Sequence, residues 1–202
     1  MIDSIEWTPK ARAVLNASAE LFYDRGIHAV GVDTVAERAG VTKKTLYDRF
    51  GSKDRLIVAY LAERDRSWRA FLNETLAQPD PSPVLQLRAV FNAAAVWSRN
   101  SGPKGCAMVN GHAEISDPAH PAYRGIVGQK HWMRSMFIDL ASAAGAPDPR
   151  SLGEQIMLLH EGAVVVAGMK GMDDAFARAA DAVMALVAVN LPESESTALG
   201  RS

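Results

Sequence analysis

The spacing of apolar residues is the feature of this chain that most restricts its fold. Along nearly the whole sequence, apolar residues recur three, four, seven and eight positions apart, which is the period of an amphipathic helix. Val14, Leu21 and Phe22 follow this pattern in the first such segment, with Pro9 suited to its first turn and Gly26 to its end. No strand-like alternation of useful length occurs. The sequence therefore predicts an all-α protein.

Glycines, prolines and capping residues divide the pattern into nine predicted helices. Their approximate ranges are 9–25, 33–39, 43–50, 53–76, 84–101, 104–115, 122–144, 151–170 and 173–191. Three prolines interrupt the helical pattern in the segment 78–83. The polar tail 192–202 is expected to be disordered.

The last two predicted helices, 151–170 and 173–191, are apolar on more than one face. A helix that is exposed to water on one side does not need this. One interpretation is that both helices are buried within a single subunit. The other is that they pack against a second copy across a two-fold axis. We favour a homodimer, because the terminal helix pair is not expected at the geometric centre of a chain of 202 residues.

Positive charge is concentrated in one short stretch of a nearly neutral chain. Residues 38–55 carry six cations and two anions, a net charge of +4, whereas the whole chain carries −1. A local basic patch is the electrostatic footprint of nucleic-acid binding. Charge alone would still favour the simpler interpretation of a solvated helix face.

The order of elements in this stretch favours nucleic-acid binding. A short helix ends before Gly40, and Thr42 is suited to cap the next short helix, which Leu46 and Phe50 would hold to the core. A short helix, a glycine turn and a second short helix form the helix-turn-helix signature. The second helix of that motif presents its first residues to the base edges of the major groove. The start of the following helix, at Lys53, favours an anion such as phosphate. The predicted DNA-contacting residues are Thr42, Lys43, Lys44, Thr45, Tyr47 and Lys53.

A family resemblance follows from these residues. The segment 31–61, GVDTVAERAGVTKKTLYDRFGSKDRLIVAYL, resembles the DNA-binding segment of the tetracycline-repressor (TetR) family of transcriptional regulators. The AGV turn, the T-L-Y triplet, Phe50 and the S-K-D-x-L sequence all match. The segment 105–121 also looks like the G-C-x-x-x-N-x-x-x-E region of one branch of that family. One difference is Gly31, where many members have a capping Ser or Thr. Glycine can still present its backbone N–H to phosphate but offers no hydroxyl, and Thr34 is the candidate to replace that contact.

The resemblance implies a nine-helix homodimer. Residues 1–55 would form a three-helix helix-turn-helix domain for double-stranded operator DNA. Residues 56–191 would form a helical domain for effector binding and dimerisation, followed by the tail 192–202. The expected function is that of a repressor released from a palindromic operator by a small apolar effector. The alternative is a constitutive DNA-binding protein that has no effector.

Soft and aromatic side chains in the predicted helices from 84 to 170 are candidates for an effector pocket, because such pockets are mostly apolar with few polar groups. Asn110 and His160 are the candidate polar contacts. The predicted effector-binding residues are Phe91, Met108, Asn110, Met133, Phe137 and His160.

Other classes of function find little support. The G-x-S-x-G and G-x-G-x-x-G motifs are absent, so we expect no enzyme and no cofactor. His112 and Glu114 have the H-x-E form of a zinc deaminase, but no P-C-x-x-C follows. The spacing of His112, His131, His160 and Glu161 specifies no metal site. No apolar run approaches the ~20 residues of a membrane span. The single cysteine favours a reducing cytoplasm.

Overall fold

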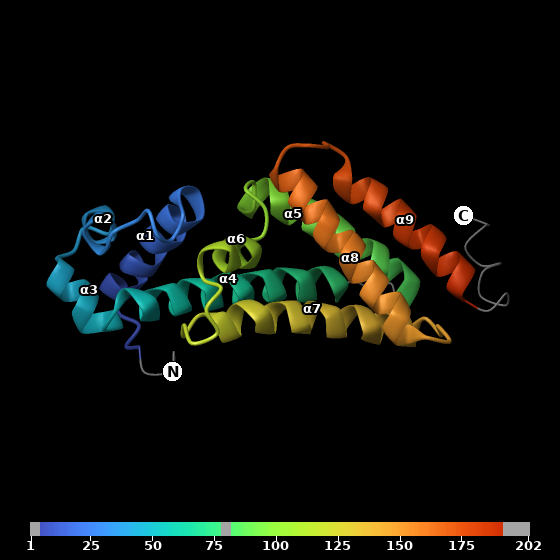
Figure 1. The fold of residues 1–202 in the computed structure, drawn as a ribbon, viewed down its shortest axis with the longest axis horizontal. Coiled ribbons are helices and arrows are strands. Elements are labelled where there is room, and N and C mark those ends of the chain that lie inside the picture. The colour runs from blue at the N-terminus through green and yellow to red at the C-terminus, as the bar shows by residue number, and fades with distance from the viewer. Residues whose placement is uncertain (1–4, 78–81, 192–202) are drawn as a thin grey trace. The chain divides into compact units, whose positions relative to one another are not determined.

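The computed structural model describes residues 5–77 and 82–191, which form nine α-helices and no strand (Figure 1). The all-α prediction is therefore confirmed for these residues. The proline-rich positions 78–81 and the tail 192–202 lie outside the described residues. Within the described ranges, no helix is long and apolar enough to cross a membrane. The helices are α1 Pro9–Arg25, α2 Val32–Arg38, α3 Lys43–Phe50, α4 Lys53–Leu76, α5 Pro83–Ser101, α6 Ala107–Glu114, α7 Tyr123–Ala143, α8 Pro149–Gly168 and α9 Ala175–Asn190.

Helix α6 begins at Ala107 and not at the predicted residue 104. Gly105 has φ +82°, which an α-helix cannot accommodate. A Cβ added to Gly168 of α8 would lie 2.7 Å from the Gly105 Cα, so the two backbones are in direct contact. This close contact fixes the start of α6, and apolar periodicity carries no signal for it.

The described residues form two compact units. The N-terminal unit contains residues 5–67 and 107–129, and the C-terminal unit contains residues 68–77, 82–106 and 130–191. Helices α4 and α7 each contribute residues to both units. A functional boundary at residues 55 and 56, within α4, stays a prediction.

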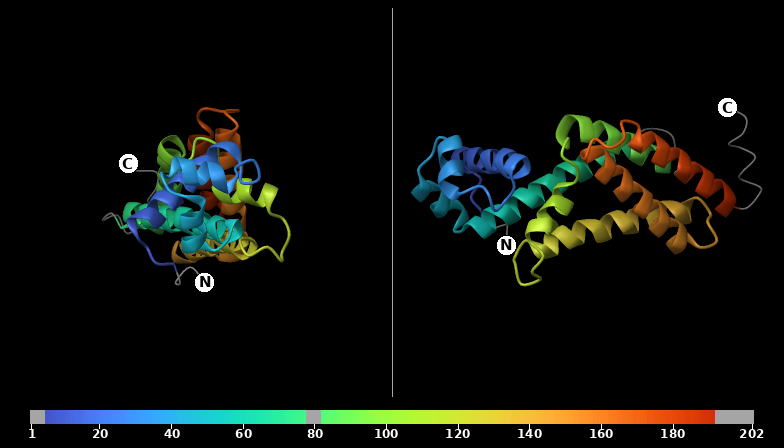
Figure 2. Two further views of the ribbon diagram at one scale, coloured as in Figure 1. Left: turned by 90° about the vertical axis from the view of Figure 1, so that its left-hand side faces the viewer. Right: turned by 45° about the horizontal axis from the view of Figure 1, so that its top comes forward.

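The N-terminal unit is built on mutual contacts among α1, α2 and α3 (Figure 2). Leu46 and Phe50 of α3 are completely buried, and Phe22 of α1 meets Tyr60 of α4 edge to face with ring centroids 5.7 Å apart. Trp7 precedes α1 and packs its ring edge-on to Phe50, 6.4 Å away. Trp7 therefore packs against the last residue of α3.

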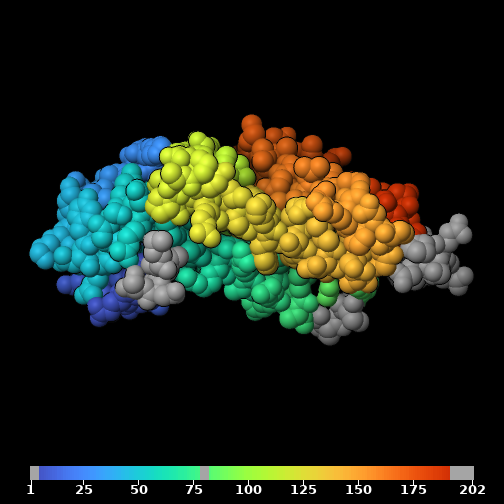
Figure 3. Space-filling view, turned by 60° about the horizontal axis from the view of Figure 1, so that its bottom comes forward, coloured from blue at the N-terminus to red at the C-terminus, as the bar shows by residue number. Residues whose placement is uncertain are grey.

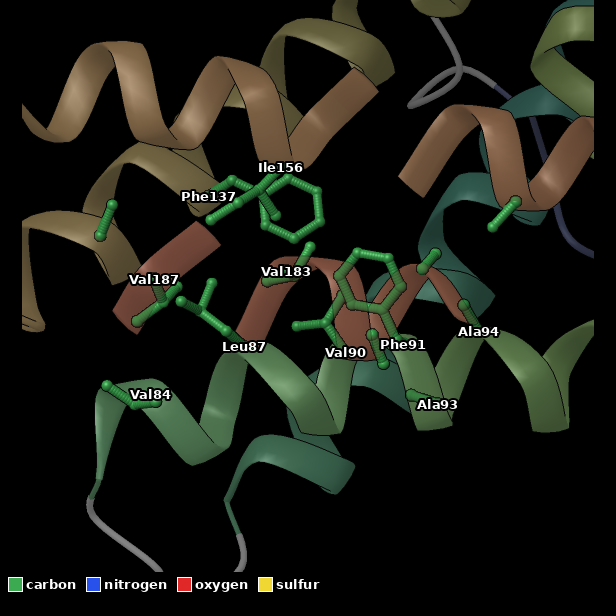
Figure 4. Close-up of a cluster of buried hydrophobic side chains, with 14 of the residues drawn as sticks. Val84, Leu87, Val90, Phe91, Ala93, Ala94, Phe137, Ile156, Val183 and Val187 are labelled. Carbon is green, nitrogen blue, oxygen red and sulfur yellow. The ribbon is translucent and has the colours of Figure 1, made fainter. Parts of the chain in front are cut away.

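The core of the C-terminal unit lies among α5, α8 and α9, which contact one another. Phe91 of α5 lies among Phe137 of α7, Ile156 of α8 and Val183 of α9 (Figure 4). Burying side chains of this size stabilises the fold by about 1.5–3 kcal/mol each.

Helices α7 and α8 approach closely at Gly153. A Cβ at Gly153 would lie 2.7 Å from the Cα of Ile138, so only glycine fits. An ion pair between Arg134 and Glu154 lies beside this contact. The surfaces of the two helices adjoin in the space-filling view, α7 in yellow and α8 in orange (Figure 3).

Three of the four tryptophans belong to the C-terminal unit. The Trp68 indole N–H donates to the sulfur of Met133 at 3.3 Å. The Trp97 ring lies 5.5 Å from the Trp68 ring, and the Arg69 guanidinium lies 4.1 Å from the centre of the Trp132 ring. The fourth tryptophan, Trp7, belongs to the N-terminal unit.

Candidate nucleic-acid interface

The turn between α2 and α3 is formed by a short set of backbone bonds. Gly40 has φ +64°, a left-handed conformation that favours glycine. Its N–H donates to the Glu37 carbonyl at 3.0 Å, and the Val41 N–H donates to the Ala36 carbonyl at 3.0 Å. These bonds reverse the chain within a few residues and set the direction in which α3 starts.

Helix α3 is capped at its start and anchored on one face. The Thr42 hydroxyl accepts a hydrogen bond from the Thr45 N–H at 3.1 Å, as predicted. Leu46 and Phe50 are buried on the inner face. The remaining predicted residues of this helix are on the outer side, with Tyr47 40% exposed. Thr42, Lys43 and Lys44 are exposed, and Thr45 is half-buried.

Both lysines at the start of α3 pair with neighbouring carboxylates. The Lys43 ammonium lies 2.9 Å from Asp33 of α2, and the Lys44 ammonium lies 2.7 Å from Asp48. The hydrogen bond and the charge of Asp33 raise the pKa of Lys43 above its ordinary value. Phosphate binding at these positions would therefore replace an intramolecular carboxylate.

The predicted phosphate contact Lys53 has a partner within the protein. Its ammonium donates to the Ile27 carbonyl at 2.7 Å and lies 5.9 Å from the centre of the Phe22 ring. An ammonium group has three donors. A phosphate contact by Lys53 stays a prediction, and it would use the donors that the carbonyl leaves.

Glu114, at the end of α6, binds the turn that follows α1. Its Oε1 accepts from the Ile27 N–H at 2.8 Å, and its Oε2 accepts from the His28 N–H at 2.6 Å. Gly26 has φ +93°, and a Cβ there would lie 3.2 Å from Glu114 Oε1. Glycine at this position therefore permits both the turn and the approach of the carboxylate.

The roles of Asp33, Asp48 and Glu114 were missed by sequence reasoning. Asp33 lies ten residues from its partner Lys43, which no helical spacing rule connects. Asp48 is four residues from Lys44, so a search for i,i+4 ion pairs would have found it. Glu114 occupies the last position of the G-C-x-x-x-N-x-x-x-E pattern, which hinted at a role without naming its partner.

Four of the six predicted effector residues are core residues of the C-terminal unit. Phe91, Met133, Phe137 and His160 are all buried. The His160 ring lies 5.6 Å from both the Phe91 and Phe137 rings, centre to centre. Within the described residues, neither ring nitrogen of His160 has a hydrogen-bond partner. These aromatic side chains thus surround one unsatisfied polar group.

A chain of polar groups connects His160 to Cys106. The His160 Nδ1 lies 3.4 Å from Glu161 Oε1, which is long for a hydrogen bond. Glu161 Oε2 lies 2.7 Å from the Lys130 ammonium, which lies 3.3 Å from the Cys106 sulfur. Burial raises the pKa of Glu161, but the adjacent His160 and Lys130 outweigh burial and lower it to about 2. Burial likewise lowers the pKa of Lys130, but Cys106 and Glu161 outweigh burial and raise it.

The other two predicted effector residues belong to the N-terminal unit, where Met108 is buried and Asn110 is exposed. A pocket of about 270 Å³ lies elsewhere, between α4 and α5, and none of the six predicted residues lines it. Over the described ranges, no three His, Cys, Asp or Glu side chains gather as a metal site would require.

The helix-turn-helix segment of this chain is similar to that of known regulatory proteins. Residues 14–60 match the family described as "Bacterial regulatory proteins, tetR family". The chain is 52% identical over 48 residues to the HTH-type transcriptional activator FasR of Mycolicibacterium smegmatis, which is 24% of this chain and 22% of FasR. It is 30% identical over 97 residues to the HTH-type transcriptional repressor BdcR of Escherichia coli, which is 48% of this chain and 49% of BdcR. The matched segments therefore span about a fifth of FasR and about half of BdcR.

A solved structure resembles the chain over most of its length. It is that of a TetR-family transcriptional regulator from Streptomyces coelicolor, with a TM-score of 0.82 and 31% identity. The match covers 89% of this chain and 96% of the other.

Proposed function

Because the chain belongs to the TetR family of transcriptional regulators, we propose that it is a repressor that a small effector releases from a palindromic operator. The observation that carries the DNA-binding part is the outer face of α3. Lys43, Lys44 and Tyr47 are exposed there, while Leu46 and Phe50 fix the helix to the core. A helix held in this way can enter a major groove without deforming the unit.

A homodimer through α8 and α9 is part of this proposal. Leu158 and Val165 of α8 and Met169, which caps the end of that helix, are spaced seven and four residues apart, so they lie along one stripe. Their exposed fractions are 73%, 41% and 77%, and Val189 of α9 is 80% exposed. Covering these side chains with a second copy would remove apolar surface from water and place two α3 helices on one palindrome.

The DNA-binding part is tested by fluorescence anisotropy with a labelled duplex from upstream of the protein's own gene. We expect binding that weakens with salt, because phosphate contacts release counterions. The variant Lys43→Ala/Lys44→Ala should bind at least roughly tenfold more weakly, since a single good base contact is worth about 1–3 kcal/mol.

A matched control is Lys104→Ala/Lys170→Ala, which removes two exposed lysines from the C-terminal unit. Its affinity should stay within about twofold of the unaltered protein. Absence of binding at low salt, or equal losses in the two double variants, would contradict the proposal.

The effector is proposed to bind at the aromatic cluster around His160. An unsatisfied imidazole between Phe91 and Phe137 suits an aromatic molecule with one hydroxyl or carbonyl group. Phenol and toluene provide a matched pair of probes that differ in the polar group. We expect phenol to raise the melting temperature and to release DNA, and expect His160→Phe to abolish its advantage over toluene.

The alternative is a constitutive DNA-binding protein. It is favoured by the close packing of the cluster, because Phe91 and Phe137 are completely buried. If a broad screen of apolar compounds neither stabilises the protein nor changes DNA binding, the constitutive alternative is preferred. A promoter–reporter assay in bacterial cells distinguishes repression from activation, because it compares reporter expression with and without the regulator.

A further inference from the structure

We propose that Glu114 is a positioning residue for DNA binding, which acts by holding the peptide group on which Lys53 rests. This inference rests on the proposed DNA-binding function and on the phosphate contact of Lys53. Glu114 itself lies at the end of α6 and is assigned no DNA contact. All the groups involved belong to the N-terminal unit.

The peptide group between Ile27 and His28 is bound on both sides. Its carbonyl accepts from the Lys53 ammonium at 2.7 Å, and its N–H donates to Glu114 Oε2 at 2.6 Å. A peptide group is a dipole of ≈ 3.5 D whose carbonyl end is negative and whose N–H end is positive. A cation at the carbonyl and an anion at the N–H both stabilise that dipole, and each strengthens the hydrogen bond of the other.

The second oxygen of Glu114 fixes the same turn from the adjacent peptide. Its Oε1 accepts from the N–H of Ile27, a residue that is only 2% exposed. A buried N–H without a hydrogen-bond partner costs free energy. The Glu114 carboxylate avoids that cost by accepting from this N–H, and so it stabilises the turn. The His28 imidazole adds a contact of 3.7 Å to Oε2. The Glu114 side chain is itself only 25% exposed.

The consequence for Lys53 is a defined position. A lysine side chain free in solution samples many rotamers, and ordering it on DNA costs free energy. The carbonyl of Ile27 orders the ammonium before DNA arrives and occupies one of its three donors. Removing Glu114 would loosen this peptide, so Lys53 would meet phosphate less well organised.

The test measures affinity of the full chain for a labelled duplex of roughly 30 bp at about 50 mM salt, in unaltered protein, Glu114→Gln, Lys53→Met and the double variant. Phosphate contacts are independent of sequence, so a generic duplex suffices. Glutamine keeps the shape of Glu114 but offers one acceptor oxygen in place of two. We expect Glu114→Gln to weaken binding roughly threefold to tenfold, as expected when groups in one network are uncoupled.

Whether Glu114→Gln weakens or tightens DNA binding distinguishes positioning of Lys53 from a long-range effect of charge. Loss of a negative charge from a protein that binds a polyanion should tighten binding if only long-range charge matters. Glu74→Gln on α4 is the control for that effect, since Glu74 is exposed in the other unit. We expect no weakening in this control.

The double variant tests the route through Lys53. If Glu114 acts by positioning Lys53, the double variant binds no more weakly than Lys53→Met alone, and both single variants lower the salt slope by up to about one unit. Additive losses, or an unchanged affinity in Glu114→Gln, overturn the inference while leaving the DNA-binding proposal intact. If Lys53→Met leaves both affinity and slope unchanged, its phosphate role and this inference fail together.

Amide hydrogen exchange supplies a readout that does not depend on DNA. Because Lys53 and Glu114 hold the same peptide, exchange at the His28 amide should accelerate in Lys53→Met as well as in Glu114→Gln. Lys53→Met leaves Glu114 in place, so it remains informative if Glu114→Gln does not fold. An unchanged His28 exchange rate in Lys53→Met overturns the inference.

Discussion

At the scale of single residues, the lysines at the start of α3 are paired with carboxylates. The carboxylates of Asp33 and Asp48 form ion pairs with the ammonium groups of Lys43 and Lys44, respectively. These pairs are exposed, and exposed ion pairs contribute little to stability. Their effect should therefore be greater on DNA binding, because phosphate and carboxylate compete for the same donors.

Replacing Asp33 with Asn should tighten DNA binding by roughly twofold to fivefold at low salt, because exposed ion pairs are typically worth about 0.2–1 kcal/mol. The pKa of Lys43 should fall toward its ordinary value in this variant, since Asp33 is the main cause of its rise. Anisotropy measures the affinity. Asp173→Asn, a change in the C-terminal unit, is the control for net charge. Weaker binding by Asp33→Asn would mean that Asp33 orients Lys43 and does not compete with DNA.

Glu161 should make the protein sensitive to acid. Its pKa is about 2 in the folded protein and 4.5 in the reference state. The lowered value means that its stabilising contribution is present above about pH 4.5 and is lost as the pH falls toward 2. The loss is on the order of 3 kcal/mol, since one pKa unit corresponds to 1.36 kcal/mol.

Urea unfolding across this pH range tests the expectation. Glu161→Gln should be less stable than the unaltered protein at neutral pH, because the half-buried Lys130 loses its carboxylate partner, and its stability should fall less steeply in acid. Glu74→Gln should retain the full acid dependence. Equal acid slopes for Glu161→Gln and the unaltered protein would show that Glu161 does not dominate the transition.

At the scale of helices, the contact between α7 and α8 depends on the absence of one side chain. Gly153→Ala would place a Cβ 2.7 Å from the Ile138 Cα and force the helices apart. We expect a destabilisation of about 1–3 kcal/mol. Gly128→Ala in α7 is the matched control, because a Cβ at Gly128 has no atom within 4 Å. The free energy of unfolding of Gly128→Ala should rise by up to about 1 kcal/mol, because alanine has a higher helix propensity than glycine. Thermal unfolding should therefore show a lower melting temperature for Gly153→Ala and an equal or higher melting temperature for Gly128→Ala.

Most helix positions could be predicted because their signals are local. Thr42 caps α3, and Leu46 and Phe50 form its buried face, as the spacing indicated. The late start of α6 could not be predicted, since it depends on contact between Gly105 and Gly168, 63 positions apart in the sequence. The partners of Lys43 and Lys53 depend in the same way on how helices are placed relative to one another. Local pattern therefore located the candidate DNA-binding residues but not the groups that hold them.

At the scale of the whole molecule, the exposed stripe on α8 determines the expected assembly. Leu158→Glu should convert a dimer to a monomer, because a carboxylate at the centre of an apolar interface is costly to desolvate. Light scattering at micromolar concentration measures the mass. Leu85→Glu on α5 is the control, since Leu85 is also an exposed leucine but lies outside α8 and α9. A monomeric mass for the unaltered protein would contradict the proposed homodimer.

The distribution of the tryptophans gives the chain separate optical reporters. Trp7 is the only tryptophan of the N-terminal unit among the described residues, and its ring packs against Phe50, the last residue of α3. With Trp68, Trp97 and Trp132 replaced by Phe, the emission of Trp7 would report the N-terminal unit, at the point where Trp7 contacts Phe50 of α3 and Arg12 of α1. The complementary variant, Trp7→Phe, would report only the C-terminal unit. Emission recorded from the two variants during an effector titration would therefore reveal which unit responds first, without any attached dye.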